Sequence, residues 1–186
     1  MLFASPPKVL LVTPGASADR DHATLLALAD ALPEIQVERL TLGTTSVPRA
    51  VTKIVDAVET LVEQRGVATG EIVIGGRSFG GRACSVAVAE GLDVGGLALL
   101  SYPLHPPGKP EKLRVEHFGD ITVPTLFVSG DRDPFGTHEE FAEHTATIAG
   151  PTEFEWVKGT HSPKGAAEQH VVEIVRRYLL ESVNST

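Results

Sequence analysis

A serine flanked by glycines is the residue of this chain whose surroundings most strongly indicate chemistry. Ser78 lies in the segment Gly76-Arg77-Ser78-Phe79-Gly80, directly after a β-branched run at residues 72–74 that is typical of a fully buried strand. Small side chains then follow at helical spacing, at Gly81, Ala83, Cys84 and Ala87. A strand, a tight turn and a helix with serine at the apex make a nucleophile elbow, in which a strained backbone holds the hydroxyl out of the turn. We therefore predict that Ser78 is a nucleophile.

The residue types around Ser78 each have a physical reason in an elbow. Side chains at positions 76 and 80 would collide in so tight a turn, so glycine is required at both. The N–H of Phe79, at the N-terminus of the following helix, would point toward an oxyanion formed beside Ser78. The competing interpretation is a plain Gly-rich connection between a strand and a helix. Other Gly-rich motifs do not fit, because no Gly-Lys-Ser/Thr follows and the glycine spacing differs from the dinucleotide-binding fingerprint.

Further polar residues follow the other predicted strands. Ligands of open α/β sheets bind beyond the carboxyl ends of the strands, and the loops expected there contain Thr13, Ser17, Asp19, Tyr102, His105, Asp131, Asp133 and His161. His161 follows the last strand and could accept the proton of Ser78, which is a weak nucleophile without a base. Tyr102 and His105 would line the mouth of the site. The other histidines have helical or polar surroundings and are expected to have no chemical role: His22, His117, His138, His144 and His170.

Two aspartates compete for the role of the acid that would orient His161. Asp131 directly follows Gly130 and could simply cap the turn there, whereas Asp133 lies further out over the strand end, before Pro134. We favour Asp133 and leave Asp131 as the alternative. No metal or cofactor is predicted, because the chain has no HExxH motif, Cys/His cluster or EF-hand loop.

Strands and helices alternate along the chain, which predicts one α/β domain over residues 1–186 with a mostly parallel, doubly wound sheet covered on both faces. Asp21 is the predicted N-cap of the first helix, and Ser162 with Pro163 is the predicted start of the last. Six strands are expected, at residues 9–12, 35–42, 72–74, 95–101, 124–130 and 153–157. The expected helices cover residues 23–32, 48–65, 79–90, 138–148 and 164–180.

The composition excludes several classes of partner. The 186 residues carry a formal net charge of −8 and no cluster of Lys or Arg, so binding to nucleic acid or to an anionic membrane has no electrostatic basis. The single cysteine, Cys84, falls on the elbow helix and is interpreted as a packing residue; it cannot form an internal disulfide, which favours a cytoplasmic location. Neither a signal peptide nor a transmembrane helix is expected.

The order Ser78, Asp133, His161 on an alternating chain resembles that of the α/β-hydrolases, and nearly the whole chain is similar to them. It is closest to small dienelactone-hydrolase-like proteins, and also resembles a compact group related to a testis-expressed protein and to a subunit of a chromatin acetyltransferase complex. The resemblance implies Ser78 as nucleophile, Asp133 as acid and His161 as base. It also implies an oxyanion hole made by the N–H groups of Phe79 and Ala16.

Two departures from the family pattern bear on the site. The loop after the first strand reads Thr13-Pro14-Gly15-Ala16, where members often carry His-Gly, so Pro14 stands in place of the histidine. The chain is also expected to begin at the third strand of the larger fold. Its segment at residues 102–122 is too short and too rich in proline to form a helical lid. A shallow, open site is therefore expected, suited to small or exposed acyl esters.

These features predict a serine hydrolase that cleaves carboxylic esters through an acyl-enzyme. The alternative is a non-catalytic interaction module that keeps the fold, which the Pro-rich stretch at residues 102–110 and the unusual Pro14 favour. Acyl transfer or perhydrolysis on the same residues is a third possibility. Arg77 and Arg82 flank the elbow and are interpreted as solvent-facing residues at the helix start rather than as contacts of an anionic substrate.

Overall fold

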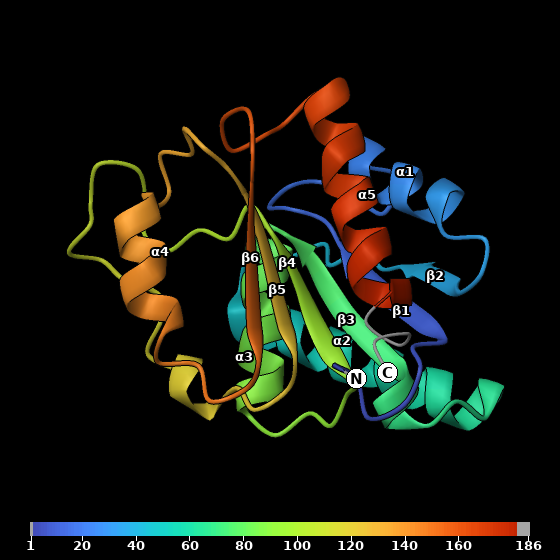
Figure 1. Cartoon of the computed structure of the whole chain (residues 1–186). Helices are drawn as coiled ribbons and strands as arrows, with labels where there is room; N and C mark the ends of the chain where they lie inside the picture. Colours follow the sequence, from blue (N-terminus) through green and yellow to red (C-terminus); the bar gives the residue numbers. More distant parts are fainter. Residues whose placement is uncertain (1, 182–186) are drawn as a thin grey trace.

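A six-stranded parallel sheet forms the centre of the computed structural model, which describes residues 2–181 (Figure 1). Its order is β2-β1-β3-β4-β5-β6, and every neighbouring pair is parallel. The strands are β1 (Val9–Thr13), β2 (Gln36–Arg39), β3 (Ile72–Arg77), β4 (Gly96–Leu100), β5 (Thr125–Gly130) and β6 (Thr152–Val157). The helices are α1 (Ala23–Ala31), α2 (Val47–Arg65), α3 (Phe79–Ala89), α4 (His138–Thr145) and α5 (Ala166–Glu181). The predicted doubly wound α/β fold and the six strands are confirmed.

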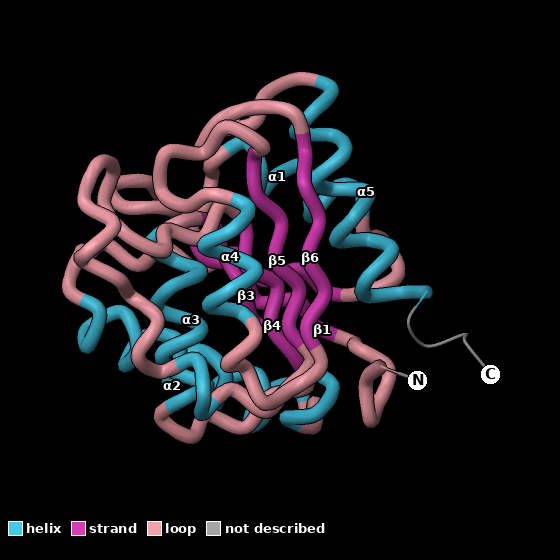
Figure 2. Tube along the Cα trace, turned by 60° about the vertical axis from the view of Figure 1, so that its left-hand side comes forward, coloured by secondary structure: helices cyan, strands magenta, loops and turns pink. Residues whose placement is uncertain are grey.

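The two faces of the sheet are covered by different helices, as Figures 1 and 2 show. Successive side chains of a strand point to opposite faces. In β1, Val9 and Leu11 pack in the core with α2 and α3, whereas Leu10 and Val12 pack in the core with α1 and α5. Both sets are buried, which explains why β1 appears in the sequence as a continuous apolar run rather than as an alternating one.

The first helix begins with a different cap from the predicted one. His22 is the N-cap of α1, and its Nδ1 accepts a hydrogen bond of 3.3 Å from the N–H of Thr24. Asp21, the predicted cap, instead forms an ion pair of 2.8 Å with Arg39 at the end of β2. The Asp21 carboxylate binds the Arg39 guanidinium instead of the backbone N–H groups at the helix start, which explains the difference.

The last helix begins later than predicted. It starts at Ala166, after Gly165, whose φ of 58° breaks the helical path, and not at Pro163 with Ser162 as cap. The hydroxyl of Ser162 is occupied by a contact to Arg77. Within the described residues, no helix combines the length and the apolar character of a membrane span.

The segment between β4 and β5 stays irregular except for a short 3-10 helix, η2 (Phe118–Asp120). Aromatic packing anchors it to the core. The ring centroid of Tyr102 lies 5.4 Å from that of Phe118 and 5.8 Å from that of Phe127. In the part of the chain that the structure describes, no lid helix covers the carboxyl ends of the strands in this segment. The segment therefore adds no helical cover to the carboxyl end of the sheet.

Candidate active site

The strand order creates a crevice at the carboxyl ends of β1 and β3. The chain winds from β1 to β2 on one side and resumes with β3 on the other, so the loops after β1 and β3 diverge to opposite faces. Such a switch point is where open α/β sheets bind ligands. Thr13, the last residue of β1, pairs with Gly76 in β3, two positions before Ser78. The loop containing Ala16 and the turn containing Ser78 are thereby brought to the same crevice.

Ser78 has the strained backbone expected of an elbow. Its φ of 51° and ψ of −116° lie outside the regions that L-residues ordinarily adopt. Its N–H donates to the carbonyl of Leu100, at 2.8 Å, and its carbonyl accepts from the N–H of Arg82, at 3.0 Å. These bonds attach the turn to β4 and to the first turn of α3, and hold the side chain at the apex, where it is partly exposed.

The side chains of Ser78, His161 and Asp133 form one hydrogen-bonded chain. Nε2 of His161 lies 2.8 Å from Oγ of Ser78, and Nδ1 lies 2.8 Å and 3.0 Å from the two carboxylate oxygens of Asp133. The Asp133 side chain is 1% exposed and that of His161 18% exposed. A buried carboxylate that accepts from Nδ1–H leaves Nε2 free to accept the serine proton. This geometry can activate the hydroxyl as a nucleophile.

Asp131 and Asp133 have different partners. Oδ1 of Asp131 accepts from the N–H of Gly159, at 2.9 Å, and the N–H of Arg132 donates to the carbonyl of Gly159, also at 2.9 Å. The loop after β5 is thus joined to the loop after β6, which contains His161. Asp133 therefore contacts the imidazole, while Asp131 positions the backbone of the adjoining loop.

The aromatic ring of Phe135 packs against His161, with ring centroids 4.0 Å apart and an interplanar angle of 30°. The N–H of Phe135 donates to Oδ1 of Asp133, at 3.0 Å. One residue therefore restrains both the imidazole and the carboxylate. Sequence reasoning missed this role, because nothing in the local pattern distinguishes Phe135 from a packing residue.

The N–H groups of Phe79 and Ala16, predicted to form an oxyanion hole, belong to the start of α3 and to the loop after β1. Phe79 is the first residue of α3, so its N–H has no acceptor one helical turn earlier. Ala16 is exposed in the loop after β1. Among the described residues, neither N–H donates to another protein group. Their role as an oxyanion hole remains the prediction drawn from the family resemblance.

Comparison with known families decides the classification. A family model described as "Alpha/beta hydrolase domain" matches residues 6–172, which include all three side chains of the hydrogen-bonded chain. The chain belongs to the α/β-hydrolase family. Its resemblance to dienelactone-hydrolase-like members, derived from the sequence, is confirmed.

Solved structures share the fold of this α/β-hydrolase at low sequence identity. Est1E from Butyrivibrio proteoclasticus is 19% identical, with a TM-score of 0.75 over 96% of this chain and 89% of that one. A dienelactone hydrolase from Anabaena variabilis is 16% identical, with a TM-score of 0.77 over 95% and 87% of the two chains. A structure described under LipS and LipT, two metagenome-derived lipolytic enzymes, is 13% identical, with a TM-score of 0.74 over 96% of each chain.

Tyr102 and His105, the two residues predicted to line the mouth, are buried in this hydrolase. Tyr102 is 0% exposed, and its hydroxyl donates to the carbonyl of Arg114, at 2.9 Å. His105 is 5% exposed, with ring nitrogens 2.8 Å from the Pro106 carbonyl and 3.2 Å from the Glu140 carboxylate. Both side chains are therefore enclosed by protein groups and shielded from solvent. We assign both to the packing that supports this loop.

Arg77, expected to face solvent at the start of the helix, instead contacts the loop after β6 with its guanidinium. Its Nη2 donates to the carbonyl of His161, at 2.6 Å, and to the hydroxyl of Ser162. Burial lowers the pKa of the guanidinium, while the nearby carboxylates of Asp133 and Glu168 act in the opposite direction. Arg77 therefore clamps the loop that presents His161 to Ser78.

Cys84, on α3, packs against the strand that leads into the elbow. Its thiol donates to the carbonyl of Gly75, at 3.2 Å, and burial raises the pKa of the thiol to about 12. The group is therefore protonated and inert near neutral pH. This environment agrees with the packing role expected from the sequence.

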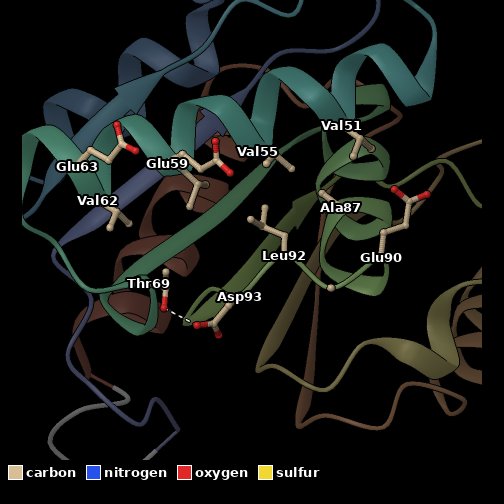
Figure 3. Close-up of a pocket in the computed structure, with 12 residues that line it drawn as sticks. Val51, Val55, Glu59, Val62, Glu63, Thr69, Ala87, Glu90, Leu92 and Asp93 are labelled. Atoms are coloured by element: carbon tan, nitrogen blue, oxygen red, sulfur yellow. Dashed lines mark hydrogen bonds between the residues drawn. The ribbon is translucent and has the colours of Figure 1, made fainter.

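A separate groove of about 650 Å³ lies between α2 and α3, far from the crevice (Figure 3). Valine side chains, including Val55 and Val62, form part of its wall, and Glu59, Glu63 and Glu90 are among the acidic residues at its edge. Its lining also includes the connection from α3 to β4, at the amino end of the sheet. None of the three hydrogen-bonded residues lines it, so it has no part in the chemistry of Ser78.

Proposed function

We propose that this α/β-hydrolase is a serine carboxylesterase, with Ser78 as nucleophile, His161 as general base and Asp133 as the acid that orients the imidazole. The observation that carries the proposal is the continuous hydrogen-bonded chain from the Ser78 hydroxyl through His161 to the buried Asp133. The strained backbone of Ser78 supports it, because such strain is retained where function requires a fixed geometry. Neither a metal nor an organic cofactor is needed for this chemistry.

The reaction follows from the geometry in two halves. As His161 Nε2 takes the hydroxyl proton, Ser78 Oγ bonds to the ester carbonyl carbon, and the carbonyl oxygen becomes an oxyanion held by the N–H groups of Phe79 and Ala16. Collapse of this tetrahedral intermediate breaks the bond between the carbonyl carbon and the alcohol oxygen. The alcohol leaves with the proton from His161. Water then gives a proton to His161 and attacks the acyl carbon, and collapse of this second intermediate breaks its bond to Ser78 Oγ. His161 returns the proton to Oγ as the acid leaves. Asp133 stabilises the imidazolium in both halves.

Small or exposed acyl esters are the proposed substrates. The described segment between β4 and β5 has no lid helix, so an acyl chain would find no covered tunnel there. The names of two structural neighbours, a dienelactone hydrolase and a pair of lipolytic enzymes, support hydrolysis of esters as the reaction class. A cytoplasmic location is proposed because the single cysteine is buried on α3 and available for no internal disulfide.

The direct test is covalent labelling with a fluorophosphonate probe, measured by intact mass. Such a probe reacts rapidly with a serine whose base and oxyanion donors are assembled. We expect one adduct on the wild-type protein and none on Ser78→Ala. Ser46→Ala is the matched control and should label normally, since Ser46 caps α2 without a side-chain hydrogen bond. Absence of an adduct on the folded wild-type protein would refute the proposal and favour the non-catalytic interaction module, to be pursued by partner capture.

Replacing Arg77 by methionine is expected to lower kcat for a short-chain ester by about tenfold or more, with little change in KM. Loss of the contact to the His161 carbonyl would let the imidazole drift from Ser78, and small displacements of a catalytic group are costly. Arg77→Lys should recover part of the loss. Arg49→Met, an exposed change on α2, serves as the control. Equal activity of Arg77→Met and the wild type would show that the clamp has no effect on catalysis.

A further inference from the structure

A groove of about 530 Å³ lies between the loop after β1 and the segment after β2. Gly15 lines one end of it. A β carbon placed on Gly15 would lie 3.7 Å from the β carbon of Ser78 and 3.4 Å from Nη1 of Arg77. Gly15 therefore places one end of this groove next to the residue that carries the reacting hydroxyl, although Ser78 itself does not line the groove. We call it the hydroxyl groove, and its walls include Gly15, Ser17, Asp19, Thr41, Thr44 and Thr45.

The walls of the hydroxyl groove come from two loops that the sheet places side by side. The loop after β1 supplies Ser17 and Asp19, and the segment between β2 and α2 supplies the threonines. β1 and β2 are paired in parallel, so these loops leave the sheet at the same edge. Any group of a substrate that extends from Ser78 toward β2 would lie between them.

The lining offers hydrogen bonds rather than apolar surface. No aromatic residue lines the groove, and the one long aliphatic side chain, Leu42, is only 2% exposed. Thr41 Oγ1 accepts from the N–H of Arg20, at 3.0 Å, and Thr44 Oγ1 accepts from the N–H of Ser46, at 3.1 Å. An acyl chain would therefore gain little by entering.

The hydroxyls of Ser17 and Thr45 are available to a ligand. In the part of the chain that the structure describes, neither the Ser17 nor the Thr45 side chain forms a hydrogen bond with another protein group, and both residues are exposed. Thr41 and Thr44 use their oxygens as acceptors and keep their hydroxyl protons to donate. The groove thus presents both donors and acceptors to a ligand.

Charged groups of both signs border the groove and together select neither an anion nor a cation: Arg77 lies beside Gly15, Lys53 beside Gly43, and Asp19 in the wall. The Asp19 carboxylate accepts from the N–H of Asp21, at 2.9 Å, and would repel an anionic group, as would the net charge of −8. Lys53 lies near Gly43 on the opposite wall, and its ammonium group already donates to the carbonyl of Leu42, at 2.6 Å. A group rich in hydroxyls satisfies the lining without bringing a charge of its own.

We propose that the hydroxyl groove binds a neutral, polyhydroxylated group, such as the sugar or glycerol portion of an ester whose carbonyl lies at Ser78. The proposal rests on the serine esterase function proposed above. It names the substrate class as acyl esters of polyols, and it assigns Ser17 and Thr45 as the residues that recognise the polyol.

The test compares two acetate esters of primary alcohols, glucose acetylated at its primary hydroxyl and ethyl acetate. The wild-type kcat/KM is expected to be about tenfold or more higher for the sugar ester, because hydrogen bonds to the polyol stabilise its transition state. The double variant Ser17→Gly/Thr45→Val should lower kcat/KM for the sugar ester by about tenfold and change that for ethyl acetate by less than about twofold. Glycine is chosen at Ser17 because its φ of 61° suits glycine.

The control variant is Thr52→Val/Thr60→Val, on the exposed side of α2, where the two hydroxyls donate to helix carbonyls. It should behave as the wild type on both esters. A double variant that loses activity equally on both esters, or on neither, would overturn the assignment of the groove. Fluorophosphonate labelling and hydrolysis of ethyl acetate without a preference for the sugar ester would also overturn it and leave the esterase function standing. Absence of both labelling and hydrolysis would refute the esterase function and, with it, the proposal of polyol binding.

Discussion

The Asp133→Asn variant is expected to hydrolyse a short-chain ester with a kcat lowered by about four orders of magnitude, the effect that the equivalent change has in a serine protease triad. The asparagine oxygen can still accept from the N–H of Phe135, so the loop should keep its shape. The amide NH₂, however, would face Nδ1 of His161 and force that nitrogen to become an acceptor. Nε2 would then carry the proton and could no longer accept one from Ser78.

Asp131→Asn is the matched control for this experiment. It makes the same chemical change two residues away, and its amide oxygen can still accept from the N–H of Gly159. We expect kcat within about threefold of the wild type. The assay is initial-rate hydrolysis, with circular dichroism and thermal unfolding to establish that both variants are folded. A large loss in Asp131→Asn together with a small loss in Asp133→Asn would reassign the acid.

The Gly76→Ala variant is expected to lose about 3 kcal/mol or more of its free energy of unfolding. A β carbon at position 76 would lie 2.6 Å from the backbone carbonyl oxygen of Thr13 and even closer to its Oγ1. Thr13 is paired with Gly76 in the sheet and is fully buried, so it cannot move aside without breaking the contact between β1 and β3. The same displacement would shift the loop that contains Ala16, and labelling of Ser78 should fall with stability.

Gly70→Ala provides the matched control for this second variant. Gly70 lies in the short 3-10 helix η1 (Thr69–Glu71) before β3, and no heavy atom lies within 4 Å of the position that its β carbon would occupy. We expect a change within about 0.5 kcal/mol. Urea-induced unfolding, followed by circular dichroism, measures both variants. The close-packing explanation fails if Gly76→Ala is as stable as Gly70→Ala.

Features that depend only on neighbouring residues could be predicted from the sequence. The strand, the turn and the small-residue helix around Ser78 are contiguous, so their propensities and spacing were sufficient to predict the elbow that β3 and α3 form. The alternation of apolar runs likewise determined the six parallel strands, and β1 shows why: its consecutive residues are buried on two faces. The start of α5 was predicted wrongly, because the hydroxyl of Ser162 is used by an arginine far away in the chain.

Which polar groups meet depends on the tertiary structure. The sequence favoured Asp133 over Asp131, and in the fold the imidazole of His161 contacts Asp133, whereas Asp131 binds the N–H of Gly159. Arg77 meets His161 across 84 positions of sequence, and Tyr102 is buried against Phe118 and Phe127, which come from distant segments. The physical reason is that backbone propensities act over a few residues, whereas hydrogen-bond partners in loops are set by the order of strands in the sheet.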